Sequence, residues 1–143
     1  MKVLSVKAVP RVSWSSEHPL NFRPRILTLS ILCGGLIIFG IGEALLIAAG
    51  AGVSPWTVLA QGVGLAAGLS IGWATFSVGI AVLLAWIPLK QIPGIGTIAN
   101  AVIIAAAIEV FLPYLPAPEN YGLKIVESAI GISMVGFGSG LYL

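Results

Sequence analysis

Charged side chains are scarce in this sequence of 143 residues: lysine, arginine, aspartate and glutamate make up 8% of it, against about 25% in soluble domains. Apolar residues make up 58%. This composition excludes a soluble globular domain, which needs far more polar surface. No charged residue occurs from Ala44 to Leu89. Because about 20 apolar residues suffice to cross a bilayer, this run must hold more than one helix.

Cysteine and histidine are nearly absent. The single cysteine, Cys33, lies in an apolar run, so the chain forms no internal disulfide and no cysteine metal site. The single histidine, His18, has no partner at metal-ligand spacing. The apolar region holds no Ser-His-Asp set, Cys-His pair or metal cluster. The sequence therefore predicts no catalytic residue, no metal and no cofactor, and we expect that the protein is not an enzyme.

Basic residues gather before the first apolar run. Five of the seven lie before residue 26: Lys2, Lys7, Arg11, Arg23 and Arg25. Residues 1–25 are polar and broken by prolines, unlike a cleaved signal peptide. We expect a cytoplasmic tail at the inner membrane of a bacterium, facing anionic lipid headgroups and not nucleic acid. The alternative is a tail that only sets the orientation of the chain.

Glycine, serine and proline divide residues 26–143 into five expected helices, so the predicted fold class is an all-α polytopic transmembrane bundle. These helices cover about 26–50, 55–69, 72–89, 95–112 and 122–143. The motif Ser54-Pro55-Trp56 gives the clearest helix start, with a capping hydroxyl followed by proline at the first helical position.

The expected second helix is short. Residues 55–69 span about 22 Å, whereas the hydrocarbon core is about 30 Å thick. If this helix crosses, Lys90 lies outside and Lys124 inside; if it does not, the two are reversed, and the distribution of basic residues is the same either way. Trp56 and Trp73 lie about 25 Å apart along a helix, near the spacing of the two interfaces. We therefore expect a full crossing and five crossings in all.

Three glycines recur at a fixed offset. Gly35, Gly40 and Gly42 return 96 residues later as Gly131, Gly136 and Gly138. Read as a repeat, the fifth helix restarts the pattern of the first. With five crossings, the second repeat would run parallel to the first. The chain would then be incomplete or a natural half-length version.

Several short motifs resemble a known family. They are "GVSPW" (52–56), "AQG" (60–62) and "PGIGT" (93–97), followed by Asn100 and Glu109. Between about residues 40 and 113 the chain resembles the YczE-like family of bacterial membrane proteins, related to the YitT-like group. The resemblance implies two tandem repeats in full-length members and no known activity. An aspartate often follows the tryptophan in that family, whereas Thr57 stands here.

Glu43 is the most informative polar residue. It lies deep in the first apolar run with no basic residue nearby. A charged acid near the bilayer centre costs about 2.5–3.5 kcal/mol, so it should face the bundle, be protonated or line a wet cavity. Two readings stay open: a proton- or cation-linked site, and an acid near the outer third of the helix that water reaches.

Three further polar residues are candidates for binding a solute or ion: Gln61, Asn100 and Glu109. Hydrogen bonding between helices is the favoured reading of the two amides, and contributes about 0.6–2 kcal/mol. For Glu109, four residues before Pro113, an interfacial and solvated position is favoured. Gly64, Gly68 and Gly72 form a strip of small residues against which a helix could pack.

These features predict transport or permeation of a small solute, because glycine- and proline-interrupted helices often build transporter sites. The expected partners are the lipid bilayer and a small solute. The alternative function is a membrane scaffold or regulator that acts through its glycine-faced helices, which would also allow a homo-oligomer. Transport requires a polar cavity around Glu43, whereas scaffolding requires a dry bundle with an exposed small-residue strip.

Overall fold

The computed structural model of the protein describes residues 25–91 and 93–142. This part of the chain folds into five α-helices. The helices are α1 (Ile26–Ala49), α2 (Pro55–Ala67), α3 (Ile71–Ala85), α4 (Ile95–Phe111) and α5 (Tyr121–Tyr142), with a short 3-10 helix, η1 (Leu112–Tyr114), after α4. These ranges contain no strand, so the predicted all-α class is confirmed. The expected basic tail lies outside the described residues except for Arg25.

Serine, proline and glycine set the ends of α2. The Ser54 hydroxyl accepts a hydrogen bond from the Thr57 amide at 3.3 Å, and Pro55 occupies the first turn. Gly68 ends the helix with φ +65°, a left-handed conformation that costs glycine little. Its amide and that of Leu69 both donate to the Gly64 carbonyl. α2 therefore stops two residues before its predicted end.

Helix α3 is also shorter than predicted. It ends at Ala85 and not at Leu89, and a series of turns covers Trp86 to Lys90. Pro88 has no amide hydrogen, and in a helix its ring would clash with the carbonyl four residues earlier. The backbone tightens before it: the Ile87 amide donates to the Leu84 carbonyl, three residues back.

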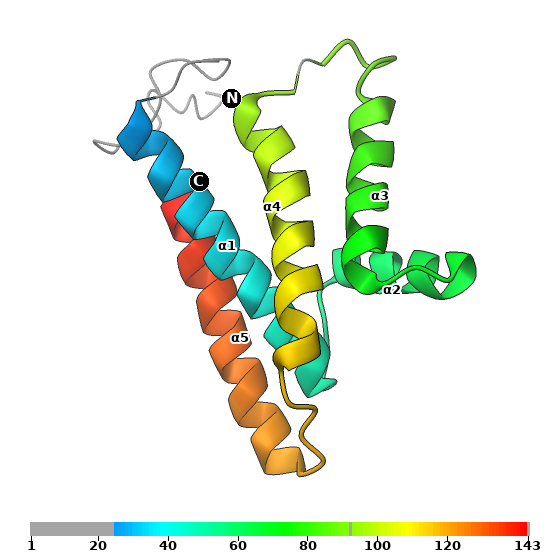
Figure 1. Ribbon diagram of the computed structural model, residues 1–143, viewed down its shortest axis with the longest axis vertical. Helices are drawn as coiled ribbons and strands as arrows, with labels where there is room; N and C mark the ends of the chain where they lie inside the picture. Colours follow the sequence, from blue (N-terminus) through cyan, green and yellow to red (C-terminus); the bar gives the residue numbers. More distant parts are fainter. Residues whose placement is uncertain (1–24, 92, 143) are drawn as a thin grey trace, which may run out of the picture.

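The expectation that α2 alone crosses the membrane is wrong. α2 has 13 residues and meets α3 at an angle of 108° across the break at Gly68. In Figure 1 it lies across the direction of the other helices. Hydropathy could not reveal this, because an apolar helix has the same composition whether it crosses a bilayer or lies along it.

The number of candidate membrane spans among the described residues is accordingly lower than the five crossings expected. Two described helices are long and apolar enough to cross a membrane: α1, and α4 continued by η1 (Ile95–Tyr114). α2 with α3 could together form a third span. Figure 1 shows that α3 returns to the end of the bundle where α1 begins. Lys90, in the loop after α3, therefore lies at that end, whereas Lys124 near the start of α5 lies at the opposite end.

Helices α1 and α5 pack closely and antiparallel (Figure 1). A Cβ built on Gly42 would lie 2.8 Å from the Gly131 carbonyl oxygen, and one on Gly138 would lie 2.7 Å from that of Gly35. Adding 96 to Gly42 gives Gly138, and adding 96 to Gly35 gives Gly131. The 96-residue offset thus turns the Gly42–Gly131 contact into the Gly138–Gly35 contact, as a two-fold axis between the two helices would. The expected parallel repeat is wrong: the helix that restarts the glycine pattern runs inverted.

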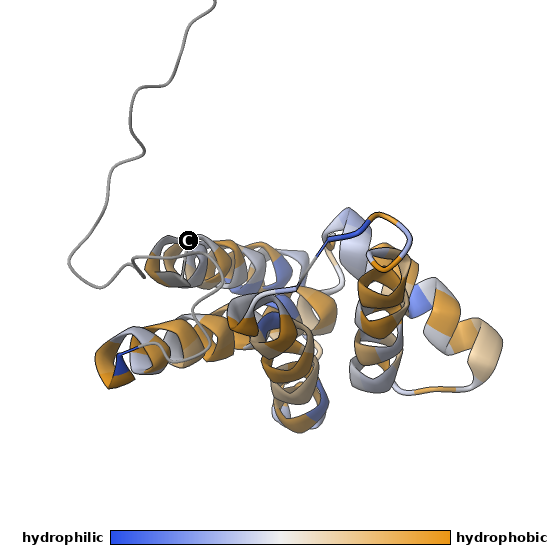
Figure 2. Ribbon diagram, turned by 90° about the horizontal axis from the view of Figure 1, so that it is seen from above, coloured by the Kyte–Doolittle hydropathy of each residue, from blue (hydrophilic) through white to orange (hydrophobic). Residues whose placement is uncertain are grey.

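The small hydrophobic core lies between α1 and α4. Its fully buried members are Leu36 and Ile108, and Ile104 joins them. Outside this core, large apolar side chains are exposed on every helix, and Figure 2 shows hydrophobic residues on the outer as well as the inner sides. An exposed helix that is apolar all round is suited to lipid and not to water.

Candidate functional site

Glu43 lies on α1 where the start of α2 passes it, and its side chain is 5% exposed. The Thr57 hydroxyl donates to Glu43 Oε2 at 2.6 Å, and Ser54 Oγ lies 3.4 Å from the same oxygen. The two hydroxyls are 2.9 Å apart. Both contacts fall on Oε2, so Oε1 keeps its capacity to accept a hydrogen bond or an ion.

The hydrogen bonds have a consistent direction. Ser54 Oγ accepts from the Thr57 amide, and Thr57 Oγ1 donates to Glu43, so the Ser54 proton is available for Thr57 Oγ1 or for the carboxylate. Glu43 also lies beside the N-terminus of α2, where the helix dipole amounts to about half a positive charge. The first turn of α2 therefore compensates a buried acid that apolar α1 could not stabilise alone.

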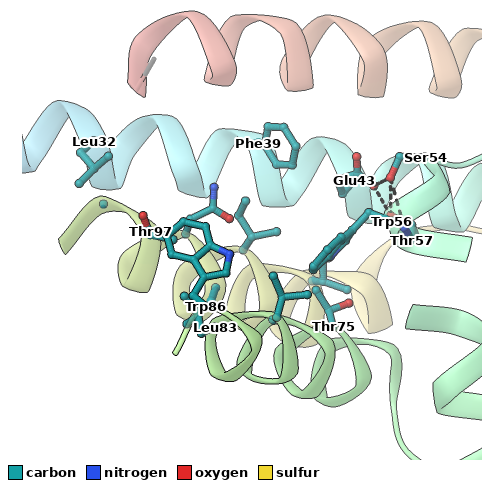
Figure 3. Close-up of a pocket in the computed structure, with 17 residues that line it drawn as sticks. Leu32, Phe39, Glu43, Ser54, Trp56, Thr57, Thr75, Leu83, Trp86 and Thr97 are labelled. Atoms are coloured by element: carbon teal, nitrogen blue, oxygen red, sulfur yellow. Dashed lines mark hydrogen bonds between the residues drawn. The ribbon is translucent and has the colours of Figure 1, made fainter. Parts of the chain in front are cut away.

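Glu43 lines a cavity of about 560 Å³ between α1, α2, α3 and α4. Ligand sites have volumes of about 300–1,000 Å³. Figure 3 shows Glu43, Ser54, Thr57 and Trp56 gathered at one end of the cavity, and Trp86 and Thr97 at the other. Along α1 the cavity extends from Leu32 to Glu43, which is about 16 Å at 1.5 Å per residue.

The remaining polar groups of the cavity are neutral. They include Asn100, Thr97 and Thr75. The Thr75 hydroxyl is committed to the Ile71 carbonyl at 2.8 Å, whereas the structure gives the Asn100 amide no hydrogen bond within the described residues. Glu43 is the only ionisable side chain among the 17 lining residues. The cavity is thus mainly apolar, with a single acid and one available amide.

The other two polar candidates lie elsewhere. Gln61 on α2 is not among the residues that line the Glu43 cavity. Glu109 on α4 accepts a hydrogen bond from the Ser70 hydroxyl at 2.6 Å and borders a separate, almost wholly apolar pocket with Trp73. The favoured interfacial reading of Glu109 did not include this partner. Its contact with Ser70 ties the α2–α3 break to α4.

The predicted glycine strip does not form one surface. Gly64 packs near the Leu69 carbonyl and Ala74, whereas Gly68 has open space around it and serves the turn. Gly72 belongs to α3, where a Cβ would lie 2.6 Å from that of Glu109 and 2.9 Å from the Ala105 carbonyl. The change in direction at Gly68 separates the three.

Sequence reasoning missed Thr57, which is 3% exposed and holds Glu43, and also Ser70. Thr57 was discounted because the resembling family often has aspartate there. Its place in the first turn after the Ser54 cap was a usable signal, because a side chain there lies close to whatever approaches the helix N-terminus. Nothing in the sequence linked Ser70 to Glu109, 39 positions away.

The chain is similar to one protein family and to two curated bacterial proteins. Residues 26–143 match the model of the family of unknown function DUF6198. An uncharacterised protein of Haemophilus influenzae is 38% identical over 138 residues, which are 96% of this chain and 62% of the relative. The uncharacterised membrane protein YczE of Bacillus subtilis is 31% identical over 121 residues, 82% of this chain and 56% of the relative.

The chain thus spans about six-tenths of the length of these curated relatives. No solved structure matches it. The resemblance drawn from "GVSPW" and "PGIGT" is confirmed, and apolar helices agree with the description of YczE as a membrane protein. The chain therefore belongs to the DUF6198 family and is a membrane protein similar to YczE.

Proposed function

We propose that the protein binds a small solute in the Glu43 cavity and lets it pass the membrane. The observation that carries this proposal is the environment of Glu43: a buried acid in a membrane helix, held by the first turn of α2, with one carboxylate oxygen that meets no donor from residues 25–91 or 93–142. Acids within membrane spans are rare and mark ion or substrate pathways.

The broken α2–α3 pair supports the same function. Transporters often place their sites where a membrane helix is interrupted and its half-helix ends point at the substrate or at coupling groups. Here the interruption lies at Gly68, and the N-terminus of α2 points at Glu43. The inverted relation of α1 and α5 is a further feature that many transporter folds share.

The test is solute flux into liposomes that contain the purified protein. Glu43→Gln keeps the side-chain volume and an oxygen that can accept from Thr57, but removes the charge. We expect the variant to fold, and to lose flux or its dependence on pH, because Glu43 is the only ionisable group among the described residues that line the cavity. Unchanged, pH-dependent flux in Glu43→Gln would contradict the proposed role. Thr97→Ser, at the far end of the cavity, is the matched control.

A membrane scaffold is the second candidate. Gly136 and Gly140, four residues apart on α5, both face open space, as a small-residue surface for another helix would. This candidate gains support if the protein shows no flux and if Gly136→Leu, unlike Gly34→Leu, abolishes self-association in detergent.

We further propose an orientation in the bacterial inner membrane with the Arg25 end in the cytoplasm. The basic residues before α1, together with Lys90, would then lie on the cytoplasmic side, as positively charged loops do. The proposed function is the binding and passage of a solute, without covalent chemistry. We therefore also propose that the protein is not an enzyme.

A further inference from the structure

The charges around the cavity determine which solutes it would favour. Among the described residues, Glu43 is its only ionisable lining residue, and no lysine, arginine or histidine of residues 25–91 or 93–142 lines it. Lys90 lies in the loop between α3 and α4, outside the set of lining residues. The N-terminus of α2 offsets about half of a unit charge, so an ionised Glu43 leaves the cavity with a net negative potential.

Aromatic rings line the same cavity. Trp86 lies at one end, Trp56 lies at the Glu43 end, and Phe39 lies between them along α1 (Figure 3). The faces of such rings attract cations, and tryptophan attracts them most strongly. A ring attracts a cation that lies within about 6 Å of its centre, so Trp86 at the far end does not share a cation with Trp56. Trp56 and the Glu43 carboxylate lie at the same end of the cavity, and an aromatic face beside an acid suits an alkylated ammonium group.

Metal ions fit this cavity poorly. The described residues contain no group of three histidine, cysteine, aspartate or glutamate side chains that could hold one, and Ca²⁺ or Mg²⁺ require several oxygen ligands. The lining is chiefly apolar, which suits a solute with a hydrocarbon surface. The volume of about 560 Å³ also exceeds the needs of a bare ion.

We propose that the Glu43 cavity selects small organic cations of the alkylammonium class. The positive group would pair with the free Oε1 of Glu43 and pack on Trp56, while the Asn100 amide offers a hydrogen bond to a polar substituent. This inference rests on the proposed function, because it names the solute class for the same cavity.

The experiment compares three probes of one shape and different charge. All three probes have a branched head of the same shape. Choline is a cation, 3,3-dimethyl-1-butanol is a neutral alcohol, and 3,3-dimethylbutanoate is an anion. Binding to the full chain in detergent is followed by tryptophan fluorescence. We expect choline to bind at least tenfold more tightly than the alcohol, since about 1.4 kcal/mol corresponds to a factor of ten, and the anion to bind least.

Two variants separate charge from shape. Glu43→Gln should remove the preference for choline over the alcohol, whereas Asn100→Ala should preserve it. If Glu43→Gln fails to fold, two variants of Trp56 provide the same evidence. Trp56→Leu should weaken the binding of choline but not that of the alcohol, and Trp56→Phe should restore part of the affinity for choline. A neutral or anionic probe that binds as well as choline would overturn the inference, and so would a failure of all three probes to bind.

Flux measurements separate the inference from the proposed function. If a neutral or anionic solute shows flux that depends on Glu43, the cation class is overturned and the proposed function stands. If no solute shows flux that depends on Glu43, the proposed function itself is overturned.

Discussion

A single methyl group at Gly42 should loosen the packing of α1 on α5. In Gly42→Ala the new Cβ would lie 2.8 Å from the Gly131 carbonyl oxygen and 2.9 Å from the Val135 amide nitrogen. Both are backbone atoms of a helix, so the helices must move apart. Overpacking of this kind costs about 1–3 kcal/mol, while alanine gains up to about 1 kcal/mol over glycine in a helix.

Gly34→Ala is the matched control, because Gly34 lies in the same helix and a Cβ there meets nothing within 4 Å. The gain in helix propensity is common to both variants and cancels in the comparison. Gly42→Ala should therefore be less stable than Gly34→Ala by about 1–3 kcal/mol. Unfolding by titration with a denaturing detergent in mixed micelles, followed by circular dichroism, measures this difference. Equal stability of the two variants would refute the close antiparallel contact.

Three further outcomes follow from the same structure. Gly138→Ala, the two-fold counterpart, should cost as much as Gly42→Ala, since its Cβ would lie 2.7 Å from the Gly35 carbonyl oxygen; a neutral effect would argue against the inverted repeat. Thr57→Val should lose about 1.5–3 kcal/mol of stability, because a hydrogen bond to a charged group is removed, whereas Thr57→Ser should lose less, both measured by thermal unfolding. Cysteines at Arg25 and Lys90, each in a background without Cys33, should react with an impermeant thiol reagent from the same side of the membrane, and a cysteine at Lys124 from the opposite side. Labelling of position 90 from the side opposite position 25 would restore a full crossing by α2.

The sequence predicted the helices well because their ends depend on local chemistry. Ser54 and Pro55 mark the start of α2 by capping, and Gly50 ends α1 in a left-handed conformation with φ +62°. The direction of α2 was not predictable in this way. It depends on how the Gly68 turn and the Ser70–Glu109 hydrogen bond place the two helices in space, and hydropathy contains no information on that angle.

The candidate site was predictable only in part. Glu43 could be recognised because a lone acid in an apolar run has a high energetic cost. The Ser54 cap places Thr57 in the first turn of α2, but its contact with Glu43 could not be predicted, since the contact joins residues 14 positions apart through the loop between α1 and α2. Gln61 and Asn100 are both amides in apolar helices. The packing of α4 against α1 and α3 places Asn100 at the cavity, whereas Gln61 on α2 is outside its lining.

The central claim is that the cavity beside Glu43 is a water-filled path for a solute. The most direct test is the rate at which a cysteine placed in the cavity lining reacts with a water-soluble thiol reagent. Asn100 lines the cavity, whereas Ile98 on the same helix is 46% exposed and outside it. In a background without Cys33, Asn100→Cys in proteoliposomes should react with a small cationic methanethiosulfonate, because such reagents modify thiols in contact with water. Ile98→Cys, facing lipid, should react at least tenfold more slowly. Equal inertness of both cysteines would show that the cavity is dry and would contradict the account.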